Sequence, residues 1–108
     1  MNAMQFAEAH RIAEMFVIRK KGTQLLMPAP AGKRGGSHVE PVKFEQAMPR
    51  FFPHEHAAKC FINQWVKGKF YNVGHDGDME VEIRPQIGRN KNDLEIVPVL
   101  LFFKEAFA

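Results

Sequence analysis

Residues Phe51–Gly68 carry the feature that most constrains the fold, which is one apolar stripe at helical spacing. Six apolar side chains recur so that they share one helix face, and they are Ala57, Ala58, Phe61, Ile62, Trp65 and Val66. Pro53 fits the first turn of a helix, and Gly68 favours its end. The pattern therefore predicts one amphipathic helix over Pro53–Lys67, whose apolar face needs a second layer to cover it.

The second layer is predicted to be an antiparallel sheet of about four strands, because short apolar-rich runs surround the helix. The candidate strands are Phe16–Arg19, Gln24–Met27, His38–Phe44, Met79–Pro85 and Leu94–Phe103. Met79–Pro85 alternates apolar and charged residues, which is typical of a half-buried strand, and we expect it to pair with Leu94–Phe103. The fold class is therefore α+β, with the helix packed on one face of the sheet.

A length of 108 residues indicates one domain. We expect residues 1–14 to form an N-terminal extension, or a short helix over 2–13, and residues 15–108 to form a single α+β domain. The single cysteine, Cys60, excludes an internal disulfide, and there is no apolar run of about 18 residues, so the sequence favours a cytoplasmic protein without membrane contact. Leu94–Phe103 is an almost continuous apolar run interrupted by Pro98, which suits an edge strand and a homodimer formed through it.

The stretch Pro28–Pro41, PAPAGKRGGSHVEP, has neither helical nor strand periodicity. Its glycines would let the backbone approach a ligand closely, and the adjacent Lys33 and Arg34 suit an anion. It lacks the Gly-Lys-Ser/Thr motif of a P-loop, so the sequence does not indicate nucleotide hydrolysis. Two interpretations remain, a flexible arm that touches phosphates or an acidic protein surface, and a solvated loop with no ligand.

The net charge of +3 hides an asymmetry between the two parts of the chain. Residues 1–71 hold 11 Lys and Arg against 5 Asp and Glu, whereas residues 72–108 hold 4 against 7. A basic surface raises the local concentration of anionic partners, of which nucleic acid is the commonest. The candidate binding residues are Arg19, Lys20, Lys21, Lys33, Arg34, Lys43, Arg50, Lys67 and Lys69.

Other reactive side chains do not assemble into a recognisable catalytic or metal motif. His56 and Cys60 share a helix face and His54 is near them, but no further ligand follows at zinc-site spacing. The segment 75–80, with two Asp and one Glu, fails the calcium-loop pattern and suits a turn. Ser37, the only serine, lies beside His38 in no nucleophile motif. We therefore expect a protein that is not an enzyme and has no metal or cofactor.

Several short motifs together resemble a group of short bacteriophage and prophage proteins. The motifs are Phe16-Val17-Ile18-Arg19, Arg34-Gly35-Gly36-Ser37-His38-Val39-Glu40-Pro41, Pro49-Arg50-Phe51-Phe52, Ala57-Ala58-Lys59 and Trp65-Val66-Lys67-Gly68. The resemblance covers about residues 15–100 and carries no catalytic residues across. It implies an accessory protein that acts in the host-cell cytoplasm by binding host machinery or nucleic acid, or by blocking a defence system.

These observations lead to two alternative functions. The first is a non-catalytic binding module that contacts nucleic acid through a basic patch and a mobile loop. The alternative is an inhibitor or adaptor that binds an acidic surface of a host protein, with the apolar C-terminal strand pairing with itself or with the partner.

Overall fold

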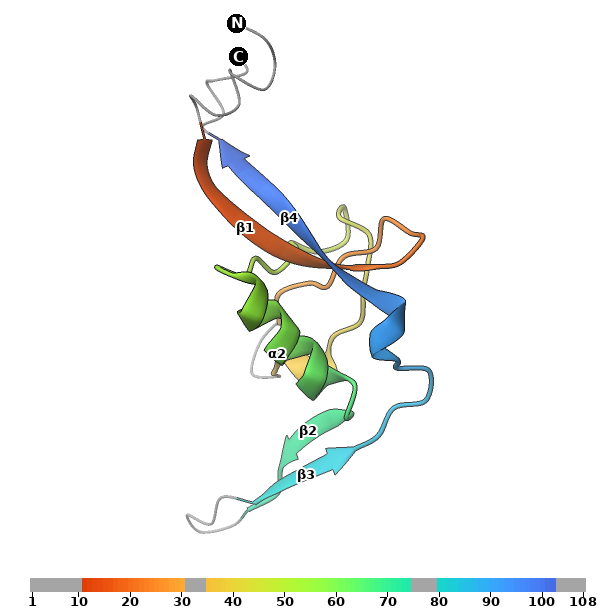
Figure 1. The fold of residues 1–108 in the computed structure, drawn as a ribbon. Helices are drawn as coiled ribbons and strands as arrows, with labels where there is room; N and C mark the ends of the chain where they lie inside the picture. The colour runs from red at the N-terminus through yellow and green to blue at the C-terminus, as the bar shows by residue number, and fades with distance from the viewer. Residues whose placement is uncertain (1–10, 31–34, 75–79, 103–108) are drawn as a thin grey trace, which may run out of the picture.

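The computed structural model describes residues 11–30, 35–74 and 80–102. The elements follow in the order β1 (Arg11–Lys20), the 3₁₀ turn η1 (Gly36–His38), α2 (Glu55–Trp65), β2 (Lys69–Asn72), β3 (Val81–Arg84), the 3₁₀ turn η2 (Lys91–Asp93) and β4 (Leu94–Phe102). β1 pairs antiparallel with β4, and β2 pairs antiparallel with β3. The predicted α+β class is confirmed, but its four strands form two separate two-stranded sheets. Figure 1 shows α2 between these two sheets.

The predicted pairing of Met79–Pro85 with Leu94–Phe103 is wrong. β3 instead forms a hairpin with β2, and its side chains are exposed on both faces, with Val81 59% and Ile83 44% accessible. The charged residues that alternate along β3 suit a ribbon in solvent. The apolar run of β4 pairs with the apolar run of β1, where both can contribute to the core.

The helix prediction is confirmed, with small shifts at its ends. His54 caps the N-terminus, because its Nδ1 accepts a hydrogen bond from the Ala57 N–H at 3.1 Å, so Pro53 precedes the cap and does not occupy the first turn. At the other end, Gly68 has φ +131°, a backbone conformation that side chains disfavour, and the chain turns there into β2.

The predicted strand at Gln24–Met27 is an irregular segment along the free side of β1. Met27 N–H donates to Ile18 O at 2.8 Å, and Leu26 forms single bridges with Arg19 and Val42. The predicted strand at His38–Phe44 reduces to the bridge at Val42. Leu25 and Met27 thus bond to Lys20 and Ile18 on the side of β1 away from β4, and Val42 bonds to Leu26 in turn.

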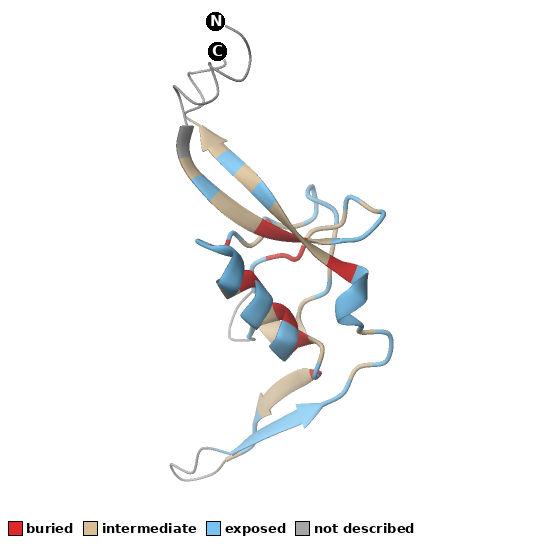
Figure 2. Ribbon diagram, viewed as in Figure 1, coloured by how far each residue is buried: buried red, intermediate tan, exposed pale blue. Residues whose placement is uncertain are grey.

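The core lies where α2 meets the β1–β4 ribbon and the segments beside it (Figure 2). Its members are Ile18, Met27, Phe52, Ala58, Ile62, Trp65 and Leu94. The apolar stripe of the helix supplies three of them, which confirms the stripe. Within the described ranges, no helix is long and apolar enough to cross a membrane.

The expected N-terminal helix over residues 2–13 is wrong where it can be compared with the structure. Residues 2–10 lie outside the described ranges, but residues 11–13 belong to β1. The strand thus begins before the expected domain start at residue 15, because the chain pairs with the apolar end of β4 from Arg11 onward.

Candidate functional site

The second half of the Pro28–Pro41 stretch is bound to the rest of the protein. Ser37 Oγ accepts a hydrogen bond from Phe70 N–H at 3.0 Å, and His38 Nε2–H donates to Phe70 O at 2.8 Å. These two contacts join η1 to β2. The expectation of a mobile arm is therefore wrong for residues 36–39, while Lys33 and Arg34 lie outside the described ranges.

A buried arginine, Arg89, also holds this segment against the rest of the protein, and the sequence alone did not point to it. The Arg89 side chain is only 2% exposed, and its guanidinium donates to Trp65 O at 2.9 Å and to Glu40 Oε1 at 2.7 Å. It also lies 4.2 Å from the centre of the Trp65 ring. Trp65 Nε1–H donates to Val39 O at 2.8 Å, so Arg89 and Trp65 together hold residues 39–40 against the end of α2.

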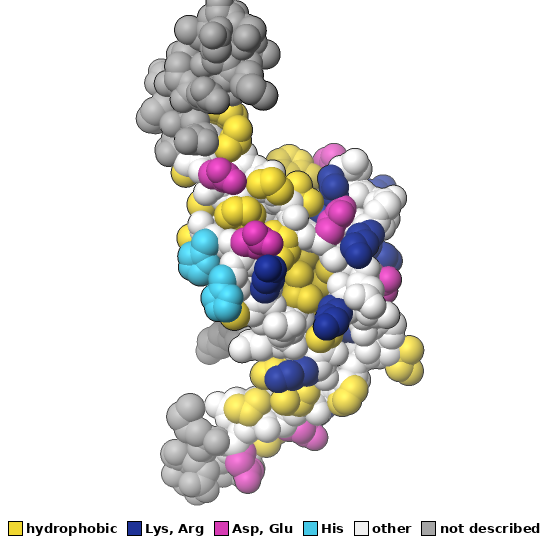
Figure 3. Space-filling view, in the orientation of Figure 1, with side chains coloured by type: hydrophobic (Ala, Val, Ile, Leu, Met, Phe, Trp, Pro, Cys, Tyr) yellow, Lys and Arg dark blue, Asp and Glu magenta, His cyan; other side chains and the backbone are white. Residues whose placement is uncertain are grey.

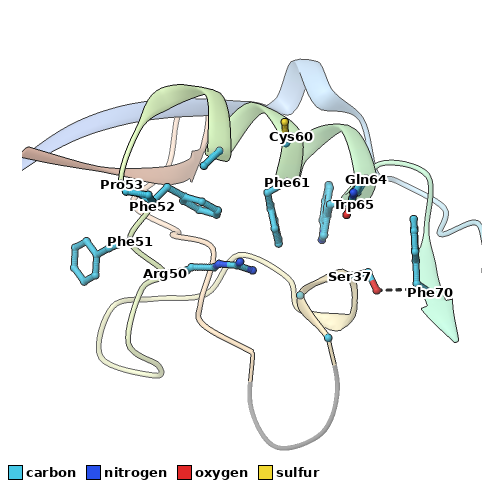
Figure 4. Close-up of a pocket in the computed structure, with 13 residues that line it drawn as sticks. Ser37, Arg50, Phe51, Phe52, Pro53, Cys60, Phe61, Gln64, Trp65 and Phe70 are labelled. Atoms are coloured by element: carbon cyan, nitrogen blue, oxygen red, sulfur yellow. Dashed lines mark hydrogen bonds between the residues drawn. The ribbon is translucent and has the colours of Figure 1, made fainter. Parts of the chain in front are cut away.

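A hollow of about 520 Å³ lies between this segment and one flank of α2, and we call it the arginine slot. Figure 4 shows Phe61 and Trp65 projecting from the helix toward the segments that carry Arg50 and Ser37. The lining residues used below are Gly36, Arg50, Phe52, Phe61 and Gln64. The wall of the slot thus combines aromatic rings with polar groups and one cation, Arg50.

A second hollow, of about 320 Å³, lies on the opposite flank of α2, and we call it the lysine hollow. Its lining residues are Lys21, Lys59, Ile62, Asn63, Lys91, Asn92 and Leu94. Three lysines thus converge from the turn after β1, from α2 and from η2. Figure 3 shows several Lys and Arg side chains on this side of the molecule, with acidic and hydrophobic side chains between them.

Of the predicted binding residues that the structure describes, only Lys21 lies in the lysine hollow. Lys59 and Lys91 were missed, because their common position depends on how α2 and η2 pack. A signal that could have found Lys59 was its place opposite the apolar stripe, whereas Lys91 carried only the signal of a turn. Arg50 lies in the arginine slot.

The other described candidates do not form one cluster. Arg19 is engaged in an ion pair with Glu95 at 2.7 Å. Lys20 and Lys43 line two further, separate hollows. Lys67 and Lys69 flank Gly68 at the far end of α2. The predicted basic patch is thus only partly brought together by the fold.

The cysteine and histidines at the start of α2 lie close together on the surface. His56 Nε2 is 3.5 Å from Cys60 Sγ, and the rings of His54 and His56 stack with centres 6.4 Å apart. Cys60 is exposed. Among the residues that the structure describes, no group of three His, Cys, Asp or Glu side chains could hold a metal ion.

Two aromatic residues, Trp65 and Tyr71, pack against other side chains, whereas the acidic segment 75–80 is described only in part. Trp65 is 4% exposed, which confirms its predicted place in the core. Tyr71 packs against His38 and under Arg84, whose guanidinium is 4.0 Å from the ring centre. A hydrogen bond from Arg84 to Glu82 raises the pKa of that guanidinium. Glu80 is exposed, and residues 75–79 lie outside the described ranges.

Comparisons of this chain with protein-family models, with curated proteins and with solved structures find no match.

Proposed function

We propose that this protein is a non-catalytic binding module that contacts the phosphates of nucleic acid through the lysine hollow. The observation that carries the proposal is the convergence of Lys21, Lys59 and Lys91 from three separate segments of the chain. Lysine is a point charge on a flexible stem, so a cluster of lysines recognises phosphate without reading sequence.

The charge in the lysine hollow is only partly neutralised by the protein itself. Lys59 pairs with Glu55 at 3.4 Å, and both side chains are more than half exposed, so this surface pair is weak. Neither Lys21 nor Lys91 forms an ion pair with a residue in the described ranges. Positive charges placed together without counter-charges attract an anionic partner and speed its association.

The surroundings of the lysines also suit a phosphate chain. The buried residues Ile62 and Leu94 form part of the wall, and Asn63 and Asn92 add exposed side-chain amides that can donate hydrogen bonds. The hollow is open to solvent, and basic side chains continue beyond it on the same face (Figure 3). An extended polyanion could occupy such a surface more completely than a small isolated anion.

The biological setting that we propose follows from the sequence motifs. Their resemblance to short phage and prophage proteins favours an accessory factor that works in the cytoplasm of a host cell. The fold places no constraint on that setting, so the proposal about binding stands or falls separately from it.

Fluorescence anisotropy with labelled single-stranded and duplex DNA tests the binding proposal. We expect measurable binding at about 50 mM salt and a large loss by about 200 mM. Lys21→Gln, Lys59→Gln and Lys91→Gln should each weaken binding, and the triple variant should reduce the slope of log affinity against log salt by about 2 to 3 on duplex DNA.

Lys43→Gln is the matched control, because Lys43 is exposed and lines a different hollow. It should change affinity much less than any substitution in the lysine hollow. Absence of DNA binding at low salt would overturn the proposal, as would an equal effect of Lys43→Gln. Binding of an acidic protein without binding of DNA would instead support the adaptor alternative.

A further inference from the structure

The arginine slot contains a guanidinium that the protein holds in place without using its hydrogen-bond donors. Arg50 Cζ lies 4.9 Å from the centre of the Phe52 ring and 5.1 Å from the centre of the Phe61 ring. The two ring centres are 5.5 Å apart, so the guanidinium rests against both. Such cation–π contacts fix the position of an arginine and leave the edge of its planar group free.

Gly36 closes the other side of this arrangement. A Cβ atom added at Gly36 would lie 2.8 Å from Arg50 Nη1 and 2.7 Å from Phe61 Cε2. Real Cβ atoms do not approach other atoms so closely, so a side chain at residue 36 would displace the guanidinium or the ring from its position. Gly36 therefore shapes the slot, even though the stretch that contains it is not a P-loop.

The donors of Arg50 are available to a ligand. No carboxylate or carbonyl oxygen of the described residues accepts a hydrogen bond from its guanidinium, whereas Arg19, Arg84 and Arg89 each bind a carboxylate. Every fully buried polar side-chain atom in the described ranges has a partner, so the unused donors of Arg50 lie where solvent can reach them. An arginine fixed in this way is pre-organised for two parallel hydrogen bonds to one anionic group.

The rest of the slot suits a planar ring attached to that anion. Its volume of about 520 Å³ lies within the range of small-molecule sites. Phe61 and Phe70 line the slot and are partly exposed, while the exposed Gln64 amide offers both donors and an acceptor. Aromatic faces stack on bases of any sequence, and an amide can pair with the edge of a base.

We propose that the arginine slot binds one nucleotide unit, with the phosphate on Arg50 and the base against the aromatic wall. The choice of a nucleotide rests on the proposed function, whereas the slot itself is independent of the lysine hollow. Ala57, Phe61 and Gln64 line the slot, but Lys59 and Asn63 line the lysine hollow, roughly half a turn away around α2. The nucleotide could be free or part of a single strand.

Isothermal titration calorimetry of the full chain tests the slot with adenosine 5′-monophosphate, adenosine and inorganic phosphate. The monophosphate should bind more tightly than either fragment. Arg50→Gln should weaken it about 10- to 100-fold, since a charged hydrogen-bonding partner is lost, and Arg50→Lys should recover only part of the affinity. Gly36→Ala should also weaken binding because its Cβ displaces the guanidinium.

Two controls separate binding from folding and from the lysine hollow. Lys59→Gln changes only the other flank of α2, so it should bind the monophosphate like the wild type. Circular dichroism verifies that Arg50→Gln remains folded. The inference is overturned if inorganic phosphate binds as tightly as the monophosphate, or if Arg50→Gln and Arg50→Lys both retain full affinity.

Anisotropy with labelled single-stranded DNA distinguishes the two sources and the two proposals. Arg50→Gln should weaken strand binding if the nucleotide belongs to a strand, and should leave it unchanged if the slot takes a free nucleotide. DNA binding that depends on Lys59 and Lys91, without monophosphate binding, would refute only the slot. Monophosphate binding that depends on Arg50, without DNA binding, would refute only the proposed function.

Discussion

Replacing Arg89 should destabilise the protein more than replacing any other charged residue that the structure describes. Arg89→Met keeps much of the side-chain volume but removes the donors to Trp65 O and to Glu40 Oε1, which are 2.9 and 2.7 Å away. Because the side chain is 2% exposed, water cannot easily replace those donors. Hydrogen bonds from a charged group contribute about 1.5 to 3 kcal/mol, and the cation–π contact with the Trp65 ring adds about 1 kcal/mol or more.

The Glu40 carboxylate contributes much less to this estimate. It is 54% exposed, so its ion pair with Arg89 is worth at most about 1 kcal/mol. We therefore expect Arg89→Met to lower the free energy of unfolding by about 3 kcal/mol, a large share of the stability of a small domain. Glu40→Gln should lower it by less than about 1 kcal/mol, and Arg89→Lys should fall between the two.

Urea unfolding measures these differences. Trp65 is the only tryptophan, it is buried in the native state, and its fluorescence reports on the region that Arg89 holds. With a denaturant slope of about 1.5 kcal/mol/M, a loss of 3 kcal/mol moves the midpoint by about 2 M. Circular dichroism provides a second probe, since the substitution also changes the surroundings of the indole ring.

Two results would refute the reasoning. A loss below about 1 kcal/mol for Arg89→Met would mean that solvent satisfies Trp65 O once the guanidinium is gone. A loss equal to that of Glu40→Gln would mean that the exposed ion pair, and not the buried contacts, carries the effect. A double-mutant cycle between the two positions measures the ion pair directly.

Two further predictions concern backbone positions. Gly68→Ala should lower the free energy of unfolding by about 1 kcal/mol or more beyond the loss for Gly88→Ala, as measured by thermal or urea unfolding. A Cβ at Gly68 would clash with the Arg84 backbone, whereas a Cβ at Gly88 meets only open space. Equal losses of stability would show that the positive φ alone decides both effects. Pro98→Val should change the free energy of unfolding by less than about 0.5 kcal/mol. It should increase self-association in analytical ultracentrifugation, since it returns an N–H to the outer edge of β4. An unchanged monomer fraction would contradict the idea that Pro98 protects this edge.

The geometry behind the Pro98 prediction also confirms its expected edge position. Phe16 lies opposite Pro98, but both backbone groups of Phe16 are bonded to Phe52, at 2.9 and 2.8 Å. The pair of Phe16 and Pro98 is therefore one that exchanges no hydrogen bonds, and the missing N–H of proline would have pointed away from β1. No strand lies beyond that edge among the described residues. The expected homodimer through β4 stays a prediction that ultracentrifugation can test.

The helix could be predicted from sequence because its signal is local. Ala58, Ile62 and Trp65 recur at helical spacing, and they are the helix residues that the core buries. The strand pairing could not be predicted in the same way. β1 and β3 are both candidate partners of β4, and the choice of β1 depends on which pairing lets both strands pack on α2. That choice is a property of the whole core and leaves no local pattern.

The grouping of charged residues in the candidate sites could not be predicted from the sequence either. Counting cations along the chain identified Lys21 and Arg50 but treated them as parts of one patch, whereas the fold places them in hollows on opposite flanks of α2. Lys59 is the reverse case, since it lay in the predicted helix but was not considered for binding. The position of a residue around the helix, and not the charge of its segment, decides which hollow it reaches.

The Pro28–Pro41 stretch was predicted to be mobile because it has no periodicity, yet its described second half is held by contacts that no local pattern can show. Ser37, Val39 and Glu40 find their partners at Phe70, Trp65 and Arg89, which lie far along the chain. Irregular backbone becomes ordered when distant groups satisfy its hydrogen bonds. Gly36 then packs against Arg50, so the described end of this glycine-rich stretch forms part of the wall of the arginine slot.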